Sequence, residues 1–168
     1  MPRLTKDEKP AVRFTLNGRA VSAEAPPRML LSDLLRHEIG ATGTHVGCEH
    51  GVCGACTVQV AGAPVRACLM LAQQAQGCDI RTVEALAEGP DLSPLQAAFR
   101  EHFALQCGFC TAGILMTFDA LFASQPEADE ATIREALSGH LCRCTGYAPI
   151  VKAALAARNR IKGGPIDA

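Results

Sequence analysis

The pattern of hydrophobic and polar residues predicts strands in the first half of this chain and helices in the second. Apolar side chains alternate with polar ones over residues 12–23, and Asn17-Gly18 interrupts them. An Asn-Gly pair between two alternating segments predicts a β-hairpin with a two-residue turn. Apolar residues then recur at helical spacing over residues 30–39, where Gly40 is placed to end the helix.

Three more short strands are expected before residue 85. Residues 57–60 form the first, Ala61-Gly62 a turn, and residues 65–70 the second, which contains Cys68. A last strand is expected over residues 79–83. Residues 11–85 are therefore predicted to form a small mixed sheet with one helix packed on it, compatible with a β-grasp arrangement.

Residues 86–160 show almost no strand pattern. Ser93 is expected to cap a helix that begins at Pro94, with Gln96 closing a capping box. Apolar spacing predicts four helices, the first from residue 95 to His102 or Phe103 and the others over residues 114–122, 129–137 and 150–157. The tail at residues 163–165 is expected to fray. The predicted fold class is α+β: a β-grasp domain over 11–85 followed by a four-helix bundle over 86–160.

Composition and charge exclude several classes of function. The chain has 168 residues and a formal net charge of −1, with no long basic run that would indicate nucleic-acid binding. No apolar run approaches the length of a membrane span. The charged segment from Met1 to Pro10 lacks the apolar core of a signal peptide and a twin-arginine pair, so we expect a reducing, cytoplasmic location. The chain has no dinucleotide fingerprint, no Walker loop and no convincing catalytic acid–base pair.

Nine cysteines are many for such a chain. Disulfides would explain them in a secreted protein, but no export signal is present and the number is odd. Metal binding explains them better. Eight cysteines would form two sets of four, and Cys78 would be a small, partly buried residue without a partner.

The first set begins in the segment G-C-E-H-G-V-C-G-A-C. Cys48, Cys53 and Cys56 have the C-x4-C-x2-C spacing of plant-type ferredoxins, and Cys68 follows after eleven intervening residues. The glycines between them allow backbone N–H groups to approach cluster sulfurs closely. Zinc ligands or buried hydrophobic cysteines are the alternatives, although zinc sites are more often built from two separated pairs.

The second set joins two predicted helix junctions. Cys107 and Cys110 form C-x2-C between the first two helices, and Cys142 and Cys144 form C-x-C between the last two. Helix N-termini present unpaired N–H groups that stabilise thiolates. The alternative is a structural zinc ion, for which C-x-C is tight but workable.

Other interpretations of the titratable residues are weaker. Cys48-x-His50 is half of a Rieske motif, but the matching C-x2-H is missing, so His50 is expected to be a loop residue near the cluster. A cysteine nucleophile with a histidine base is conceivable, yet a cysteine among three others is normally a ligand. His37 is expected to lie on the surface of its helix.

The two sets together resemble the small iron–sulfur subunit of the xanthine oxidase family of molybdenum hydroxylases. Three motifs carry the resemblance, in the family's order: G-C-E-H-G-V-C-G-A-C-T-V, Q-C-G-F-C-T and C-R-C-T-G-Y. The resemblance extends from about Val12 to about Ala157. It implies a plant-ferredoxin-like domain that binds one [2Fe–2S] cluster, and a helical domain that binds a second one. The implied ligands are Cys48, Cys53, Cys56 and Cys68 for the first cluster, and Cys107, Cys110, Cys142 and Cys144 for the second.

The resemblance also implies a heterotrimer, which itself can dimerise. A large subunit would hold the molybdopterin cofactor, and a medium subunit would hold FAD. Electrons would pass from molybdenum to the helical-domain cluster, then to the ferredoxin-like cluster and to FAD. Gln106 and Cys144 match family positions that contact the pterin. His140, Ala148 and Ala112 depart from frequent family residues, and none of them is a ligand. A zinc-stapled binding module and a free-standing ferredoxin are the alternative functions.

Overall fold

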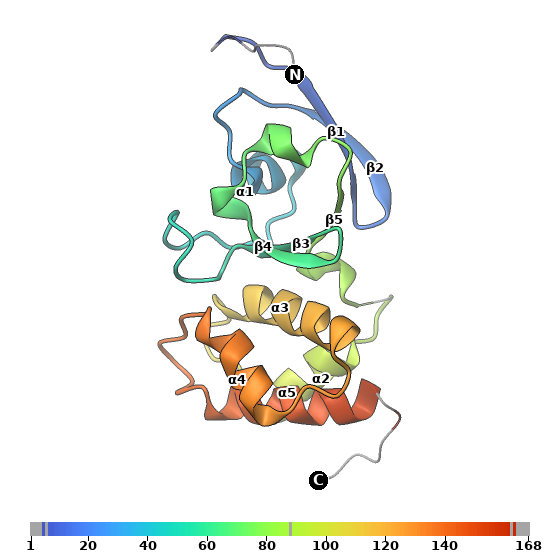
Figure 1. Cartoon of the computed structure of the whole chain (residues 1–168), viewed down its shortest axis with the longest axis vertical. Helices are drawn as coiled ribbons and strands as arrows, with labels where there is room; N and C mark the ends of the chain where they lie inside the picture. Colours follow the sequence, from blue (N-terminus) through green and yellow to red (C-terminus); the bar gives the residue numbers. More distant parts are fainter. Residues whose placement is uncertain (1–4, 6, 88, 162, 164–168) are drawn as a thin grey trace.

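The computed structural model describes residues 5, 7–87, 89–161 and 163 of the chain. A mixed sheet with its helix lies at one end of the long axis, and the later helices form a second layer at the other end (Figure 1). The sheet has the order β2-β1-β5-β3-β4, in which β1 and β5 are parallel and the other pairs are antiparallel. Its strands are β1 (Ala11–Leu16), β2 (Arg19–Glu24), β3 (Thr57–Val60), β4 (Ala63–Arg66) and β5 (Asp79–Arg81).

The predicted hairpin and first helix are both present. Leu16 pairs with Arg19 across a turn in which Asn17 and Gly18 have φ angles of 52° and 77°. The helix starts as α1 (Leu31–Asp33) and continues in the wider π form as η1 (Leu34–Ile39). Gly40 ends it at φ 85°, as predicted. Buried leucines of this helix join the inward side chains of β1 in one core.

Two strand predictions extended too far along the chain. β4 ends at Arg66, and Cys68 lies in a 3₁₀ turn, η2 (Ala67–Leu69), where a strand was predicted. The N–H of Ala67 donates to the carbonyl of Cys56 at 3.2 Å, after which the chain leaves the sheet and buries Cys68 beside Cys56. A further 3₁₀ turn, η3 (Ala72–Ala75), precedes β5. β5 ends at Arg81, because residues 83–85 form the turn η4 (Val83–Ala85).

Four helices form the second layer around one core, as predicted. The capping box of the first is confirmed, since the Ser93 hydroxyl accepts from the N–H of Gln96 at 3.2 Å and the Gln96 side chain accepts from the N–H of Ser93 at 3.0 Å. The first helix was predicted to reach His102 or Phe103; it ends at Glu101 with His102 as its C-cap, and the side chain of Phe103 is exposed. The helices are α2 (Pro94–Glu101), α3 (Thr111–Ser124), α4 (Glu130–Ser138) and α5 (Ala148–Ile161). The predicted frayed tail lies largely outside the described residues.

The two layers meet where α3 packs on β3. Alternation along β3 sends Val58 into the sheet's core and turns Gln59 toward α3. The buried Gln59 amide donates to the carbonyl of Met116 at 3.0 Å and to the carboxylate of Asp119 at 2.7 Å. Arg81 also donates to Asp119, at 3.1 Å. Paired polar groups therefore join the layers. Among the described residues, no helix has both the length and the apolar character to cross a membrane.

Candidate metal centres

The first four predicted ligands meet beside the loop that enters β3. Cys48 and Cys53 are half-buried, and Cys56 and Cys68 are buried. The N–H of Cys53 donates to the sulfur of Cys48 at 3.4 Å. This contact, followed by one from the backbone of His50, lowers the pKa of Cys48 to about 6. Burial, followed by the neighbouring thiol of Cys56, raises the pKa of Cys68 to about 11.

The four predicted ligands of the second set meet where the segment before α3 and the loop before α5 lie next to each other. Cys107 and Cys144 are exposed and their sulfurs lie 3.4 Å apart. Cys110 is the N-cap residue of α3; burial, followed by its contact with Cys142, raises its pKa to about 12. Burial opposes ionisation of Cys142, but hydrogen bonds led by the Thr145 hydroxyl lower its pKa overall. A hydrogen bond from the backbone N–H of Phe109, followed by one from the Cys144 thiol, lowers the pKa of Cys107.

The thiols of each set come together as two pairs. In the first set, Cys48 contacts Cys53 and Cys56 contacts Cys68. In the second, the side-chain contacts join the exposed pair Cys107–Cys144 and the buried pair Cys110–Cys142.

This pairing can be compared with the ligand sets of zinc and iron–sulfur sites. A tetrahedral zinc ion takes four sulfurs at about 2.3 Å from a single centre. Among the described residues, no three cysteine, histidine or acidic side chains are close enough together to hold one metal ion. A [2Fe–2S] cluster takes two thiolates on each of two irons. Each set thus offers two pairs of thiols, the donors that one [2Fe–2S] cluster requires.

A direct hydrogen bond joins the two ligand loops. The N–H of Leu141 donates to the carbonyl of Cys53 at 3.0 Å, and Leu141 is covalently next to Cys142. The N–H of Cys142 donates to the Tyr147 hydroxyl at 2.9 Å, which in turn donates to the carbonyl of His140 at 3.3 Å. One ligand of each set is thus fixed by the same network.

His140 fills the space behind this junction. Its side chain is buried, and Nε2 lies 2.8 Å from the Thr117 hydroxyl. Burial, followed by the charge of Arg66, lowers its pKa to about 4, so the ring is neutral at pH 7. A Cβ atom on Gly54 would lie 2.3 Å from Nδ1, and the φ of Gly54 is +77°. Only glycine therefore allows the first loop to approach His140.

An aromatic contact joins the first ligand loop to the other loop of the second set, the one that contains Cys107 and Cys110. The rings of His45 and Phe109 are stacked with centroids 5.0 Å apart and planes at 14°. His45 Nδ1 also lies 2.9 Å from the carbonyl of Phe109. His45 precedes the first cysteine of one set, and Phe109 lies between two cysteines of the other.

The remaining predicted residues have clear positions. Gln106 is exposed and directly precedes Cys107, so it lies near the exposed pair that includes Cys144. His37 is exposed, as expected. His50 lies in the first ligand loop with its ring next to the carbonyl of Cys48, as expected, and Cys78 is partly buried. Arg66, Thr117 and Gln59 also form contacts between the layers, which no sequence pattern predicts. Their partners are distant in the chain, so no local pattern marks them.

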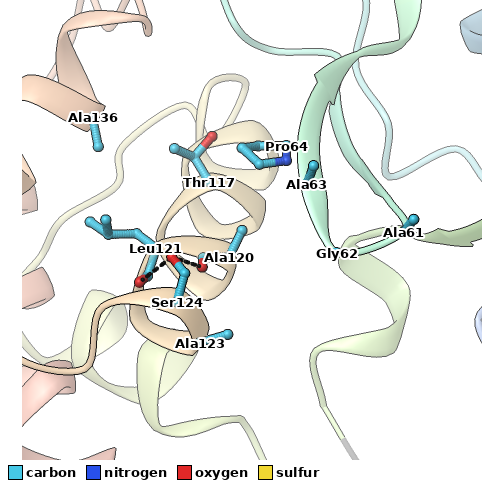
Figure 2. Close-up of a pocket in the computed structure, with 10 residues that line it drawn as sticks. All are labelled: Ala61, Gly62, Ala63, Pro64, Thr117, Ala120, Leu121, Ala123, Ser124 and Ala136. Carbon is cyan, nitrogen blue, oxygen red and sulfur yellow. Dashed lines mark hydrogen bonds between the residues drawn. The ribbon is translucent and has the colours of Figure 1, made fainter.

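A groove of about 690 Å³ lies between the β3–β4 turn and α3 (Figure 2). Its only polar side chains are those of Thr117 and Ser124, and the Ser124 hydroxyl donates to carbonyls of its own helix. The groove therefore lacks the titratable groups of a catalytic site. It is lined by Ala61, Gly62, Ala63, Pro64, Thr117, Ala120, Leu121, Ala123, Ser124 and Ala136.

Comparison with protein families matches both parts of the chain. Residues 14–82 match the 2Fe-2S iron-sulfur cluster binding domain, and residues 82–155 match the [2Fe-2S] binding domain. These matches agree with the two thiol sets. The chain binds two [2Fe–2S] clusters.

Most of the chain is similar in sequence to subunits of two bacterial enzymes. It is 55% identical to the caffeine dehydrogenase subunit gamma of Pseudomonas sp. (strain CBB1), over 84% of this chain and 87% of the relative. It is 53% identical to the nicotine 6-hydroxylase small subunit of Paenarthrobacter nicotinovorans, over 87% and 88%.

Two solved structures have the same fold. A chain of quinoline 2-oxidoreductase from Pseudomonas putida 86 superposes with a TM-score of 0.89 at 47% identity, covering 95% of this chain and all of that one. Aldehyde oxidoreductase from Desulfovibrio gigas has a TM-score of 0.87 at 37% identity, covering 91% of this chain and 17% of that one.

Proposed function

This chain belongs to the small iron–sulfur subunits of the xanthine oxidase family of molybdenum hydroxylases, and we propose that it relays electrons from a molybdenum cofactor to FAD. A large partner subunit would hold the molybdopterin, and a medium partner subunit would hold the flavin. As part of such a complex the chain is an oxidoreductase subunit without a substrate site of its own.

The ligand assignment follows the thiol pairs. Cys48 and Cys53 would bind one iron of the first cluster, and Cys56 and Cys68 the other. Cys107 with Cys144, and Cys110 with Cys142, would bind the irons of the second cluster. When bound, a [2Fe–2S] cluster accepts and gives up one electron at a time, at a potential tuned by hydrogen bonds and solvent exposure.

The proposed electron relay is supported mainly by the hydrogen bond between the loops that contain Cys53 and Cys142. Because Leu141 donates to the carbonyl of Cys53 at 3.0 Å, Cys142 and Cys53 are connected by backbone atoms and one hydrogen bond. A rigid, short connection is what transfer between two centres needs. A free-standing ferredoxin could hold the same clusters, so co-purification with partner subunits is what separates it from this proposal.

The exposure of the second set's cysteines supports the order in which electrons would pass through the two clusters. Cys107 and Cys144 are the only exposed cysteines of the described residues, and Gln106 beside them is exposed as well. We assign this face to the pterin, which Gln106 and Cys144 would contact. The Cys48 loop, at the other end of the relay, would then face FAD.

The names of the relatives narrow the substrate of the complex. Caffeine, nicotine and quinoline, which appear in the names of three relatives, are all nitrogen heterocycles. We propose that the complex oxidises a compound of this class. The substrate pocket would belong to the large subunit.

Isolation of the chain with its partners tests this function. Expressed with the genes encoded beside it, the chain should co-purify with a molybdopterin-containing and an FAD-containing subunit. A nitrogen heterocycle should then reduce both clusters under anaerobic conditions. A colourless chain that contains zinc and binds neither subunit would contradict the proposal.

A further inference from the structure

Phe103 is the most exposed large hydrophobic side chain of the described residues. Its exposed fraction is 81%, against 62% for the next, Leu69. It follows the C-cap residue of α2, His102, and three residues separate it from Cys107, the first cysteine of the C-x2-C segment. A single exposed apolar residue needs no special explanation, so exposure alone decides nothing here.

The backbone of Phe103 supplies a second, independent observation. The N–H of Ala104 donates to the carbonyl of Phe99 at 2.9 Å, and the N–H of Phe103 donates to that of Arg100 at 3.3 Å. These two bonds form a Schellman motif, in which the residue at the position of Phe103 adopts a left-handed conformation. Its φ is +51°. Glycine is the residue that usually occupies this position, because a Cβ atom is strained there.

Both features work against the stability of the isolated chain. The phenyl ring, 81% exposed, removes little apolar surface from water, and its Cβ atom strains the helix end. Strained residues that bring no benefit to their own fold are typical of sites that contact a partner or ligand. Among the described residues, no contact stabilises the exposed ring of Phe103. A stabilising contact would therefore come from a partner.

The position of Phe103 indicates which partner this is. Gln106 follows Phe103 three positions along the chain, a distance of at most about 11 Å for an extended chain. Leu105, which is 39% exposed, and the exposed Cys107 lie in the same loop. A subunit that covers Gln106 and Cys107 to receive or deliver electrons also reaches Phe103.

We propose that Phe103, with Leu105 beside it, is an apolar anchor for the large molybdopterin-binding subunit. This inference rests on the proposed function. Aromatic side chains that enter a pocket of the partner commonly dominate the binding energy of an interface. The strain at Phe103 is then retained because the side chain stabilises the complex.

Two substitutions separate the contact from the strain. Phe103→Ala removes the ring and keeps the Cβ atom, whereas Phe103→Gly removes both. Both variants should weaken the affinity for the large subunit on the order of tenfold to a hundredfold. Only the glycine variant should raise the melting temperature of the isolated, cluster-loaded chain, by about 2 °C.

Leu92→Ala is the matched control. Leu92 is 42% exposed and precedes α2, so the eight residues of that helix, about 12 Å, separate it from Phe103. Affinity of each variant for the tagged large subunit is measured by dissociation from the assembled complex. Leu92→Ala should dissociate like the wild type.

Three results would overturn the anchor. Unchanged affinity in both Phe103 variants would exclude a contact with the large subunit. A lower melting temperature of Phe103→Gly would show that the ring supports its own fold. Loss of self-association of the isolated chain, with the affinity for the large subunit unchanged, would identify a second copy as the partner. A wild-type chain that binds no molybdopterin subunit would instead refute the proposed function itself.

Discussion

Gly113 is the residue at which the helical layer comes closest to the first ligand loop. It lies in the first turn of α3, and a Cβ atom there would be 2.2 Å from the carbonyl oxygen of Gly54 and 3.1 Å from that of Ala55. The Gly54 carbonyl cannot easily turn away, because it accepts from the Thr57 hydroxyl at 2.6 Å and from the Thr57 N–H at 3.1 Å. Since a carbon and a carbonyl oxygen pack at about 3.3 Å, Gly113→Ala requires a movement of about 1 Å.

The cost of this substitution combines two opposing effects. Overpacking in a tight contact costs about 1–3 kcal/mol. Alanine is favoured over glycine in a helix by about 1 kcal/mol, which offsets part of it. We expect a net loss of about 1–2 kcal/mol and a melting temperature lowered by about 2–6 °C.

The spectroscopic effect is the more specific one. We expect movement of α3 away from Gly54 to lengthen the hydrogen bond between Leu141 and Cys53 as well, because His140, next to Leu141, is bonded to Thr117 of α3. The variant should keep both clusters but show weaker magnetic coupling between them in electron paramagnetic resonance of the reduced protein. Reduction of the ferredoxin-like cluster by substrate should be slower in the assembled complex.

Ala123→Gly is the control for helix propensity, because Ala123 is exposed near the end of the same helix. It should lower stability by at most about 1 kcal/mol and leave the coupling unchanged. If Gly113→Ala were more stable than the wild type, with unchanged coupling, α3 would not pack on the loop at this distance and the reasoning would fail.

Three further predictions follow from individual contacts. Cys144→Ser should damage the helical-domain cluster and slow reduction by substrate while the ferredoxin-like signal persists; loss of the ferredoxin-like signal instead would refute the ligand pairing. Asp119→Ala should cost about 1–2 kcal/mol in denaturant unfolding, because the buried Gln59 amide loses an acceptor, whereas Asp119→Asn keeps one and should cost less. In metal-free protein at pH 7, Cys48 should be alkylated first, because its pKa is lowered to about 6 and thiolates are the reactive form. Cys68 and Cys110, with pKa values raised to about 11 and 12, should react last and gain reactivity only as the pH rises toward those values. Peptide mass spectrometry gives the order, and equal rates at all three cysteines would contradict it.

Much of the fold could be predicted because the signals are local. Asn17-Gly18 fixes a hairpin, and Ser93 with Gln96 fixes a helix start, through contacts within four residues. The grouping of the cysteines could also be predicted, because spacing along the chain and a family resemblance both indicate it. The two matched family models agree with that division.

Features that depend on distant contacts could not be predicted. Cys68 was expected in a strand, but it lies in a turn because burial beside Cys56 draws the chain out of the sheet. Phe103 continues the apolar spacing of α2, yet the helix ends before it and the ring is exposed. His140 was noted only as a departure from the family, whereas the structure buries it against Thr117 and Gly54. In each case a tertiary contact overrides the local pattern.

The central claim is that this chain holds two [2Fe–2S] clusters that pass electrons between a molybdenum cofactor and FAD. The most direct measurement is rapid-freeze electron paramagnetic resonance of the assembled complex after mixing with a nitrogen-heterocyclic substrate, combined with iron and sulfide analysis. We predict about four irons and four sulfides per chain and two distinct cluster signals that develop as substrate is consumed. A single signal, or clusters that stay oxidised while the substrate is turned over, would contradict the relay.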